Sequence, residues 1–289
     1  MTVLPIDELK GKMLDYITYY YETGQVRPEC YGVTAGDFDS AGLSTGIIQF
    51  NFLSGTIQPI WSYLINNYST VCKTAFNNVL TDYNTWVDVV LNRTNQQQQD
   101  WGTSITDPNN SHKVVEPWNT YFKQLGMSPE GVERQLLGCE PYFATALSYK
   151  ETFNLYSRRG YTLLMDIAVQ SGSISTTVQN QILSDFTLLP TDLTREEEEH
   201  QKMIIIANRR ADAVGATYRE SYRDRKLAIA NGTGTVYGGF VTTEPYELNL
   251  EPAFESDVYV EENPGEEYTP GEINPNPFYI VLSNNIIGA

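Results

Sequence analysis

The stretch ECYGVTAGDFDSAGLSTGIIQFNFLSGT, residues 29–56, combines three carboxylates, Glu29, Asp37 and Asp39, with a glycine-rich turn. It follows a segment from Ile6 to about Thr23 in which apolar residues recur at helical spacing, so Glu29 should lie just beyond a first amphipathic helix. Asp39 comes ten residues after Glu29, among residues that favour turns. The stretch therefore predicts a helix end and a loop that each present an acid.

This arrangement meets the needs of glycoside hydrolysis. One carboxylic acid must stay protonated to give its proton to the leaving oxygen, and an ionised carboxylate must act on water or on the sugar. A helix end and an adjoining loop can hold Glu29 and Asp39 on opposite walls of a cleft. Asp37 is the competing base, and the alternative for all three residues is that they are ordinary loop acids.

The rest of the chain predicts a mainly α fold. Thr194 and Glu197 form a capping box that should start a helix reaching about Ala230. Further helical segments are expected over residues 46–52, 56–66, 79–91, 128–153 and 161–170. A small β-turn or hairpin is expected in the glycine-rich loop at the active site.

The composition changes past Asn231, where a glycine-rich run precedes a proline-rich, acidic segment. From Glu244 onward the chain has 10 acidic and no basic residues, which leaves 26 acidic residues against all 19 basic ones before it. The net charge of −17 therefore divides into about −10 for this segment and −7 for the rest. We predict a folded body over residues 1–239 and an extended tail over residues 240–289 that anchors the chain in an assembly.

The composition also argues against several classes of function. Phosphate groups need clustered Lys and Arg, so nucleic-acid binding and docking on anionic lipid are not expected. No apolar run approaches the ~20 residues of a membrane span, and the N-terminal residues do not have the pattern of a secretory signal peptide. Cys30, Cys72 and Cys139 are widely spaced, and His112 and His200 have no ligand at a suitable spacing. We expect buried free thiols, no metal site and no cofactor.

The order of residues from Glu29 to Thr45 resembles the catalytic stretch of phage-type lysozymes, in which a Glu ends the first helix and an Asp and a Thr follow on a small β-turn. The run STGIIQF, residues 44–50, is similar to the Thr-Ala-Gly-Ile-Ile-Gly-Phe run of bacterial chitosanases, which belong to the same superfamily. Two later segments resemble chitosanase-like domains of phages and prophages. They are SRRGYTLLMDIAVQSGSI at 157–174, and ANRRADAV at 207–214 followed by YRDRKLAIANGTGTVYGG at 222–239.

The resemblance implies a lysozyme-like, chitosanase-like helical domain with Glu29 as general acid and Asp39 as general base. Ser44 or Thr45 would supply a hydroxyl that helps to position water. We also assign substrate contacts to four residues: Asp37, Gln49, Asn51 and Asp166. The interval from Glu to Asp is shorter than in chitosanases and closer to the lysozyme value. Two carboxylates separated by a turn leave room for a water molecule, which favours an inverting mechanism.

The leading hypothesis is a peptidoglycan hydrolase of the muramidase type that cuts β-1,4 glycosidic bonds. It would be a virion component of a phage tail or baseplate, or part of an injection device, bound through its tail to the structural proteins. One alternative is a chitosanase, whose cationic polymer suits an acidic surface. The other is a structural virion or baseplate component with a lysozyme-like fold and little activity.

Overall fold

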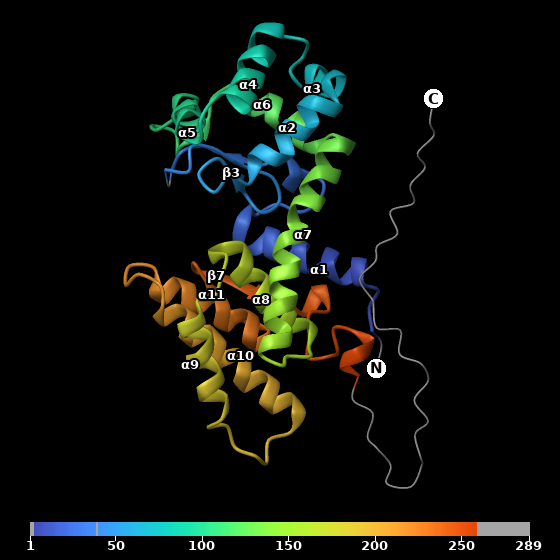
Figure 1. Ribbon diagram of the computed structural model, residues 1–289, viewed down its shortest axis with the longest axis vertical. Helices are drawn as coiled ribbons and strands as arrows, with labels where there is room; N and C mark the ends of the chain where they lie inside the picture. The colour runs from blue at the N-terminus through green and yellow to red at the C-terminus, as the bar shows by residue number, and fades with distance from the viewer. Residues whose placement is uncertain (1–2, 39, 259–289) are drawn as a thin grey trace. The chain divides into compact units, whose positions relative to one another are not determined.

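The computed structural model describes residues 3–38 and 40–258, and these form a mainly α fold, as predicted (Figure 1). The α-helices are α1 (Ile6–Ile17), α2 (Ile57–Asn67), α3 (Ser69–Ala75), α4 (Leu80–Asn92), α5 (Asn95–Ser104), α6 (Trp118–Met127), α7 (Pro129–Thr152), α8 (Arg158–Ser171), α9 (Thr176–Phe186), α10 (Arg195–Asp212) and α11 (Arg219–Asn231). A π-helix, η1 (Thr18–Glu22), extends α1, and the 3₁₀ segments are η2 (Glu29–Gly32), η3 (Glu244–Tyr246) and η4 (Glu255–Asp257). None of the helices in the described ranges has both the length and the apolar character of a membrane span.

Three small antiparallel sheets accompany the helices in the described residues. They are formed by β1 (Thr34–Ala35), β2 (Ser44–Thr45) and β3 (Phe50–Asn51); by β4 (Thr106–Asp107) and β5 (Lys113–Val114); and by β6 (Thr233–Val236) and β7 (Gly239–Thr242). In the first sheet β2 is central, with Thr45 opposite both Thr34 and Phe50. The predicted helix over residues 46–52 is therefore wrong. Gly46 and Gln49 have φ of 78° and 55°, which turns the chain back into β3.

Side-chain caps explain where several helices begin. At the start of α10 the Thr194 hydroxyl accepts from the backbone N–H of Glu197, whose carboxylate accepts from the N–H of Thr194, so the predicted capping box is confirmed. The predicted continuous helix to Ala230 is wrong. The chain turns at residues 213–218, a segment that contains Gly215, and a separate helix α11 follows.

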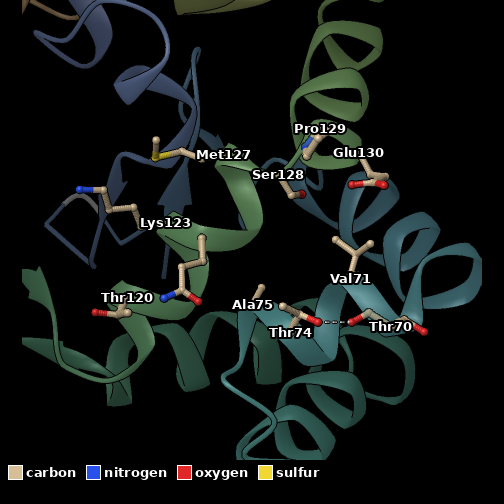
Figure 2. Close-up of a pocket in the computed structure, with 11 residues that line it drawn as sticks. Thr70, Val71, Thr74, Ala75, Thr120, Lys123, Met127, Ser128, Pro129 and Glu130 are labelled. Carbon is tan, nitrogen blue, oxygen red and sulfur yellow. Dashed lines mark hydrogen bonds between the residues drawn. The ribbon is translucent and has the colours of Figure 1, made fainter.

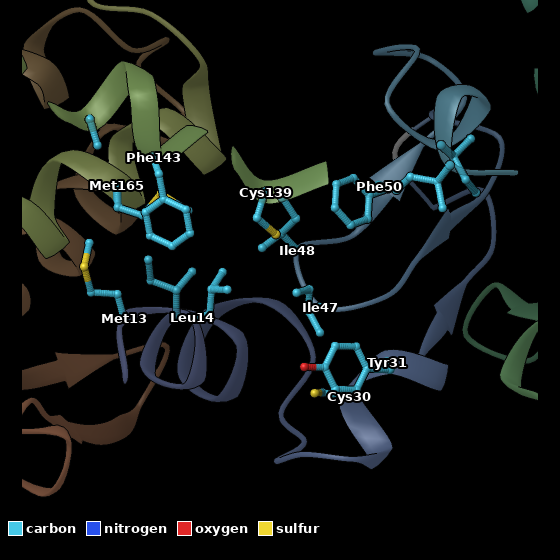
Figure 3. Close-up of a cluster of buried hydrophobic side chains, with 14 of the residues drawn as sticks. Met13, Leu14, Cys30, Tyr31, Ile47, Ile48, Phe50, Cys139, Phe143 and Met165 are labelled. Carbon is cyan, nitrogen blue, oxygen red and sulfur yellow. The ribbon is translucent and has the colours of Figure 1, made fainter. Parts of the chain in front are cut away.

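The core joins the helices that hold the candidate site. Helix α7 packs against both α2 and α8, and Figure 1 shows it running between them. Figure 3 shows Cys139 of α7 facing Ile47 and Ile48, which follow β2, and Met13 and Leu14 of α1 lie in the same buried cluster. The turn after β2 is thus fixed by the apolar core.

The folded body extends beyond the predicted boundary at residue 239, and it forms one unit up to Asp257. Leu248 and Ala253 are buried, with relative exposures of 0% and 1%. The N–H groups of Arg158 and Arg159, at the start of α8, donate to backbone carbonyls of residues 251 and 249. The predicted tail over 240–289 is therefore wrong for residues 240–257, and its remaining part from residue 259 lies outside the described residues.

Candidate active site

Glu29, the predicted general acid, opens the short helix η2 and is exposed to solvent. Within the part of the chain that the structure describes, its carboxylate has no hydrogen-bond or ion-pair partner. Asp39, the predicted general base, lies outside the described residues. The pairing of Glu29 with Asp39 across a cleft therefore stays a prediction.

Asp37, the competing base, is half-buried and holds its own loop in place. Its Oδ1 accepts from the N–H of Gly42 at 3.1 Å, and its Oδ2 accepts from the Thr103 hydroxyl at 2.6 Å. Its N–H donates to the Thr106 hydroxyl at 3.0 Å. One carboxylate oxygen thus closes the glycine-rich turn and the other ties it to α5, which is a structural role.

The hydroxyl and amide residues from Ser44 to Asn51 lie in the small sheet and in the turn between its strands β2 and β3. Ser44 and Thr45 lie in the central strand with exposures of 5% and 6%, and the Thr45 hydroxyl donates to a backbone carbonyl of the preceding loop at 3.2 Å. The Gln49 amide donates to the carbonyl of Gly46 at 2.9 Å, and the Asn51 amide donates to that of Gln49 at 3.3 Å. These contacts fix the shape of the turn.

A buried glutamine of α7, Gln135, holds this turn in place through hydrogen bonds. Its Oε1 accepts from the N–H of Ile47 at 3.1 Å. Its Nε2 donates to the carbonyls of Tyr31 and Gly126 at 3.1 and 3.0 Å. A Cβ at Gly46 would lie 2.1 Å from Oε1, so the turn needs glycine for space as well as for its backbone angle.

A glutamate that the sequence analysis did not select, Glu22, lies at the end of the first helical segment. It is the last residue of η1, and π-helical turns of this kind occur often at functional sites. The hydroxyl of Thr18, also in η1, donates to the Ile47 carbonyl at 2.9 Å, which ties this segment to the hairpin turn. The Glu22 side chain is 14% exposed, and its carboxylate accepts from Nη2 of Arg225 at 2.7 Å. Glu22 therefore ends a segment that is hydrogen-bonded to the STGIIQF turn through Thr18.

Glu22 belongs to a charged cluster that consists of Glu22, Asp166, Arg225 and Lys226. The Arg225 guanidinium donates to Asp166 Oδ1 through Nε at 3.0 Å and through Nη2 at 2.6 Å. Lys226 donates to the other oxygen of Asp166 and to the Gln170 amide oxygen, the latter at 2.5 Å. Asp166 is fully buried at 0% exposure. Its predicted contact with substrate does not fit this position, because both oxygens are engaged by cations inside the protein.

Burial and charge set the protonation of this cluster. Burial raises the pKa of Glu22 above its usual value, although the charge and hydrogen bond of Arg225 act in the opposite direction. Burial also disfavours the ionised form of Asp166, but the two cations outweigh it and hold the pKa of that carboxyl below its usual range. Burial lowers the pKa of Lys226 to about 7 against the attraction of Asp166. Glu22 thus keeps its proton to a higher pH than usual, whereas Asp166 loses its proton at a lower pH than usual.

Sequence signals for these residues exist, although they are short. Glu22 directly precedes the Thr-Gly pair at which the first helix stops. Glu22, and not Glu29, is therefore the glutamate at the end of the first helical segment. Arg225 and Lys226 belong to the run YRDRKLAIAN, in the second of the two segments that resemble chitosanase-like domains. Periodicity alone would place both cations on a solvated helix face.

One pocket lies away from this cluster, between α3, α6 and the start of α7 (Figure 2). Its volume is about 810 Å³, and Lys123 and Glu130 are its charged lining residues. It contains none of the predicted site residues, and we assign it no role. Across residues 3–38 and 40–258, no group of three or more His, Cys, Asp or Glu side chains is placed to hold a metal ion.

No protein-family model and no curated protein matches the chain. Among solved structures, a native chitosanase from Bacillus subtilis MY002 is similar to it, with 16% sequence identity and a TM-score of 0.49 over 78% of this chain and 86% of the chitosanase. This similarity is too low to carry a fold name or an activity to this chain.

Proposed function

We propose that the chain is a glycoside hydrolase with a lysozyme-like fold in which Glu22 is the general acid. A general acid must keep its proton near the working pH, and burial raises the pKa of Glu22 in that direction. Glu22 also ends the first helical segment, as the acid does in the lysozymes that the motif resembles. A carboxyl that is only 14% exposed, at the end of a segment hydrogen-bonded to the STGIIQF turn, carries the proposal, whereas Glu29 is exposed.

Asp39 remains the proposed general base. The engagement of both Asp37 oxygens in the loop supports Asp39 over Asp37 for this role. In the inverting reaction, Glu22 gives its proton to the leaving glycosidic oxygen while Asp39 takes one from the attacking water. Ser44 and Thr45 would help indirectly, because they lie in the buried strand that shapes the turn.

Peptidoglycan is the proposed substrate, in keeping with the resemblance to lysozymes. Chitosan is the second candidate, favoured by the net charge of −17, because this polymer is cationic. Delivery by a phage tail, baseplate or injection device is proposed from composition alone. The anchor would lie in residues 259–289, which retain the acidic, proline-rich character of the predicted tail.

The test compares Glu22→Gln with Glu29→Gln in the full chain, with reducing ends released from peptidoglycan and from chitosan as the readout. We expect Glu22→Gln to lower the rate by about 10²–10⁴-fold, the usual contribution of general acid catalysis. Glu29→Gln should retain the wild-type rate and melting temperature, and melting curves should show that Glu22→Gln is folded at the assay temperature. The reverse pattern would return the acid to Glu29. A wild-type chain that releases no reducing ends from either polymer would favour the structural role.

A further inference from the structure

A second pocket of about 540 Å³ lies between the β6–β7 hairpin, the end of α11 and the segment that follows β7. We call it the hairpin pocket, and the lining residues used here are Arg159, Asn231, Thr233, Phe240, Glu244 and Asn249. Figure 1 shows β7 beside α11, and both strands contact that helix. Its volume lies within the ~300–1,000 Å³ typical of sites for small molecules.

The two faces of the hairpin differ in chemistry. Val236 and Val241 are buried on the inner face, where Tyr20 and Tyr21 of η1 pack against them. The outer face carries Phe240, which is 70% exposed, and three threonines: Thr233, Thr235 and Thr242. An apolar ring that points away from the core beside hydroxyl groups offers the flat surface on which the C–H face of a sugar can pack.

The polar side chains of the hairpin pocket hold unused hydrogen-bond donors. Arg159 donates through Nε to the Leu248 carbonyl at 3.3 Å, and among the described residues its Nη1 and Nη2 have no partner. The guanidinium lies against Gly232, where a Cβ would come within 2.6 Å of Nη2. The side-chain oxygens of Asn231 and Asn249 accept hydrogen bonds, whereas no partner within the described ranges is found for their NH₂ groups.

The charges of the pocket nearly cancel. Arg159 and Glu244 have opposite charges, and Glu247 is paired with Lys12 at 2.7 Å. A polyanion would meet two carboxylates, and a polycation would meet the Arg159 guanidinium. A neutral ligand rich in hydroxyl and acyl oxygens fits the donors without either repulsion.

We propose that the hairpin pocket is a second glycan-binding site, which takes a neutral segment of a β-1,4-linked N-acetylated amino sugar chain. The sugar face packs on Phe240, and its acyl and hydroxyl oxygens accept from Arg159, Asn231 and Asn249. The choice of ligand class rests on the proposed function. The site differs from the proposed catalytic centre, because none of its lining residues belongs to the charged cluster. It holds the polymer while another part of the same chain is cut.

The test measures retention of the full chain in native gels that contain glycol chitin, a soluble N-acetylated polymer. All variants carry Glu22→Gln so that the polymer stays uncut. Phe240→Ala and Arg159→Lys should each weaken retention, Phe240→Ala by about ten-fold, as for an aromatic anchor of an interface. The matched control is Leu188→Ala, which removes a side chain that is 79% exposed on the loop after α9.

The proposal is overturned if Phe240→Ala and Arg159→Lys migrate like Leu188→Ala in glycol chitin. It is also overturned if the retention that depends on Phe240 appears in cationic glycol chitosan and not in glycol chitin. Melting curves separate lost binding from lost folding, and the exposed Phe240 can be removed without opening the core. Retention is measured without cleavage, so a failure of the hydrolysis test leaves this result interpretable.

Discussion

The β1–β3 region, formed by these three strands with Gln135, and the charged cluster both contact η1, but opposite kinds of interaction hold them together. In the β1–β3 region, the neutral amide of Gln135 satisfies backbone groups from three separate segments. In the charged cluster, two cations share one fully buried carboxylate, and Arg225 also reaches Glu22. One side of the candidate site is therefore held by neutral hydrogen bonds and the other by buried ion pairs.

The difference separates two properties that catalysis needs. The hydrogen bonds of Gln135 go to backbone groups and not to Glu22, so they position the turn without acting directly on the protonation of that acid. Buried charges raise or lower a pKa, and they make the structure sensitive to the loss of any partner, because an unpaired charge inside a protein is costly. We therefore expect substitutions in the charged cluster to affect both stability and the pH dependence of hydrolysis. Substitutions in the β1–β3 region should affect stability alone.

The largest effect should come from ending the chain at residue 239, before the segment that packs at the start of α8. A chain ending at residue 239 loses the buried Leu248 and Ala253 and the ion pair of Lys150 with Asp257 at 2.7 Å. Each large buried apolar side chain contributes about 1.5–3 kcal/mol, against a total stability of about 5–15 kcal/mol. We expect this chain to be unfolded by circular dichroism and a chain ending at residue 258 to melt like the whole protein. A cooperative, wild-type-like melt of the shorter chain would restore the boundary at residue 239.

Removal of the shared carboxylate should be the most damaging single substitution. Asp166→Ala leaves Lys226 buried without its carboxylate partner and Arg225 paired with Glu22 alone, which should lower the free energy of unfolding by about 3–5 kcal/mol. The control is Asp185→Ala, which breaks the more exposed pair with Arg209 and should cost little. Urea titrations of both variants measure the difference. Equal losses would mean that burial of the cluster does not control its energetics.

The sequence was informative where structure is local and less so where distant segments meet. The capping box at Thr194 depends on neighbouring residues, so its position could be predicted. The turn at Gly46 was predicted as a helix, because the Gln135 side chain that holds it comes from a distant segment. The choice between Glu22 and Glu29 depends on Arg225, which lies 203 positions from Glu22 and buries it by tertiary packing. The hydrogen bond between Ile47 and Gln135 likewise joins residues 88 positions apart. Neither Arg225 nor Gln135 shows a periodic signal in the sequence that assigns it to the site.

A smaller loss of stability should follow from removing the side-chain amide of Gln135. Gln135→Ala leaves the N–H of Ile47 and two carbonyls without a partner, and unsatisfied buried groups cost about 1–3 kcal/mol. The control is Gln96→Ala on the exposed face of α5, which loses only the contact with Asp100 and should change stability by no more than about 0.5 kcal/mol. Chemical denaturation compares the two. The pH profile of hydrolysis should keep its wild-type shape in Gln135→Ala, because no charge is removed near Glu22.

The smallest effect, and the one most specific to the charged cluster, is a shift in the pH profile of hydrolysis. A general acid works only while protonated, so the rate should fall as pH rises through the pKa of Glu22. Burial raises this pKa and Arg225 lowers it, so Arg225→Gln should raise it further and move the alkaline limb to higher pH. Lys226→Met should act in the same direction but more weakly, since Lys226 affects Glu22 through space while Arg225 donates to it directly. Arg225→Lys keeps the charge and should stay closer to wild type. Rates measured across pH below the melting temperature of each variant test this order, and a shift to lower pH in Arg225→Gln would exclude Glu22 as the titrating acid.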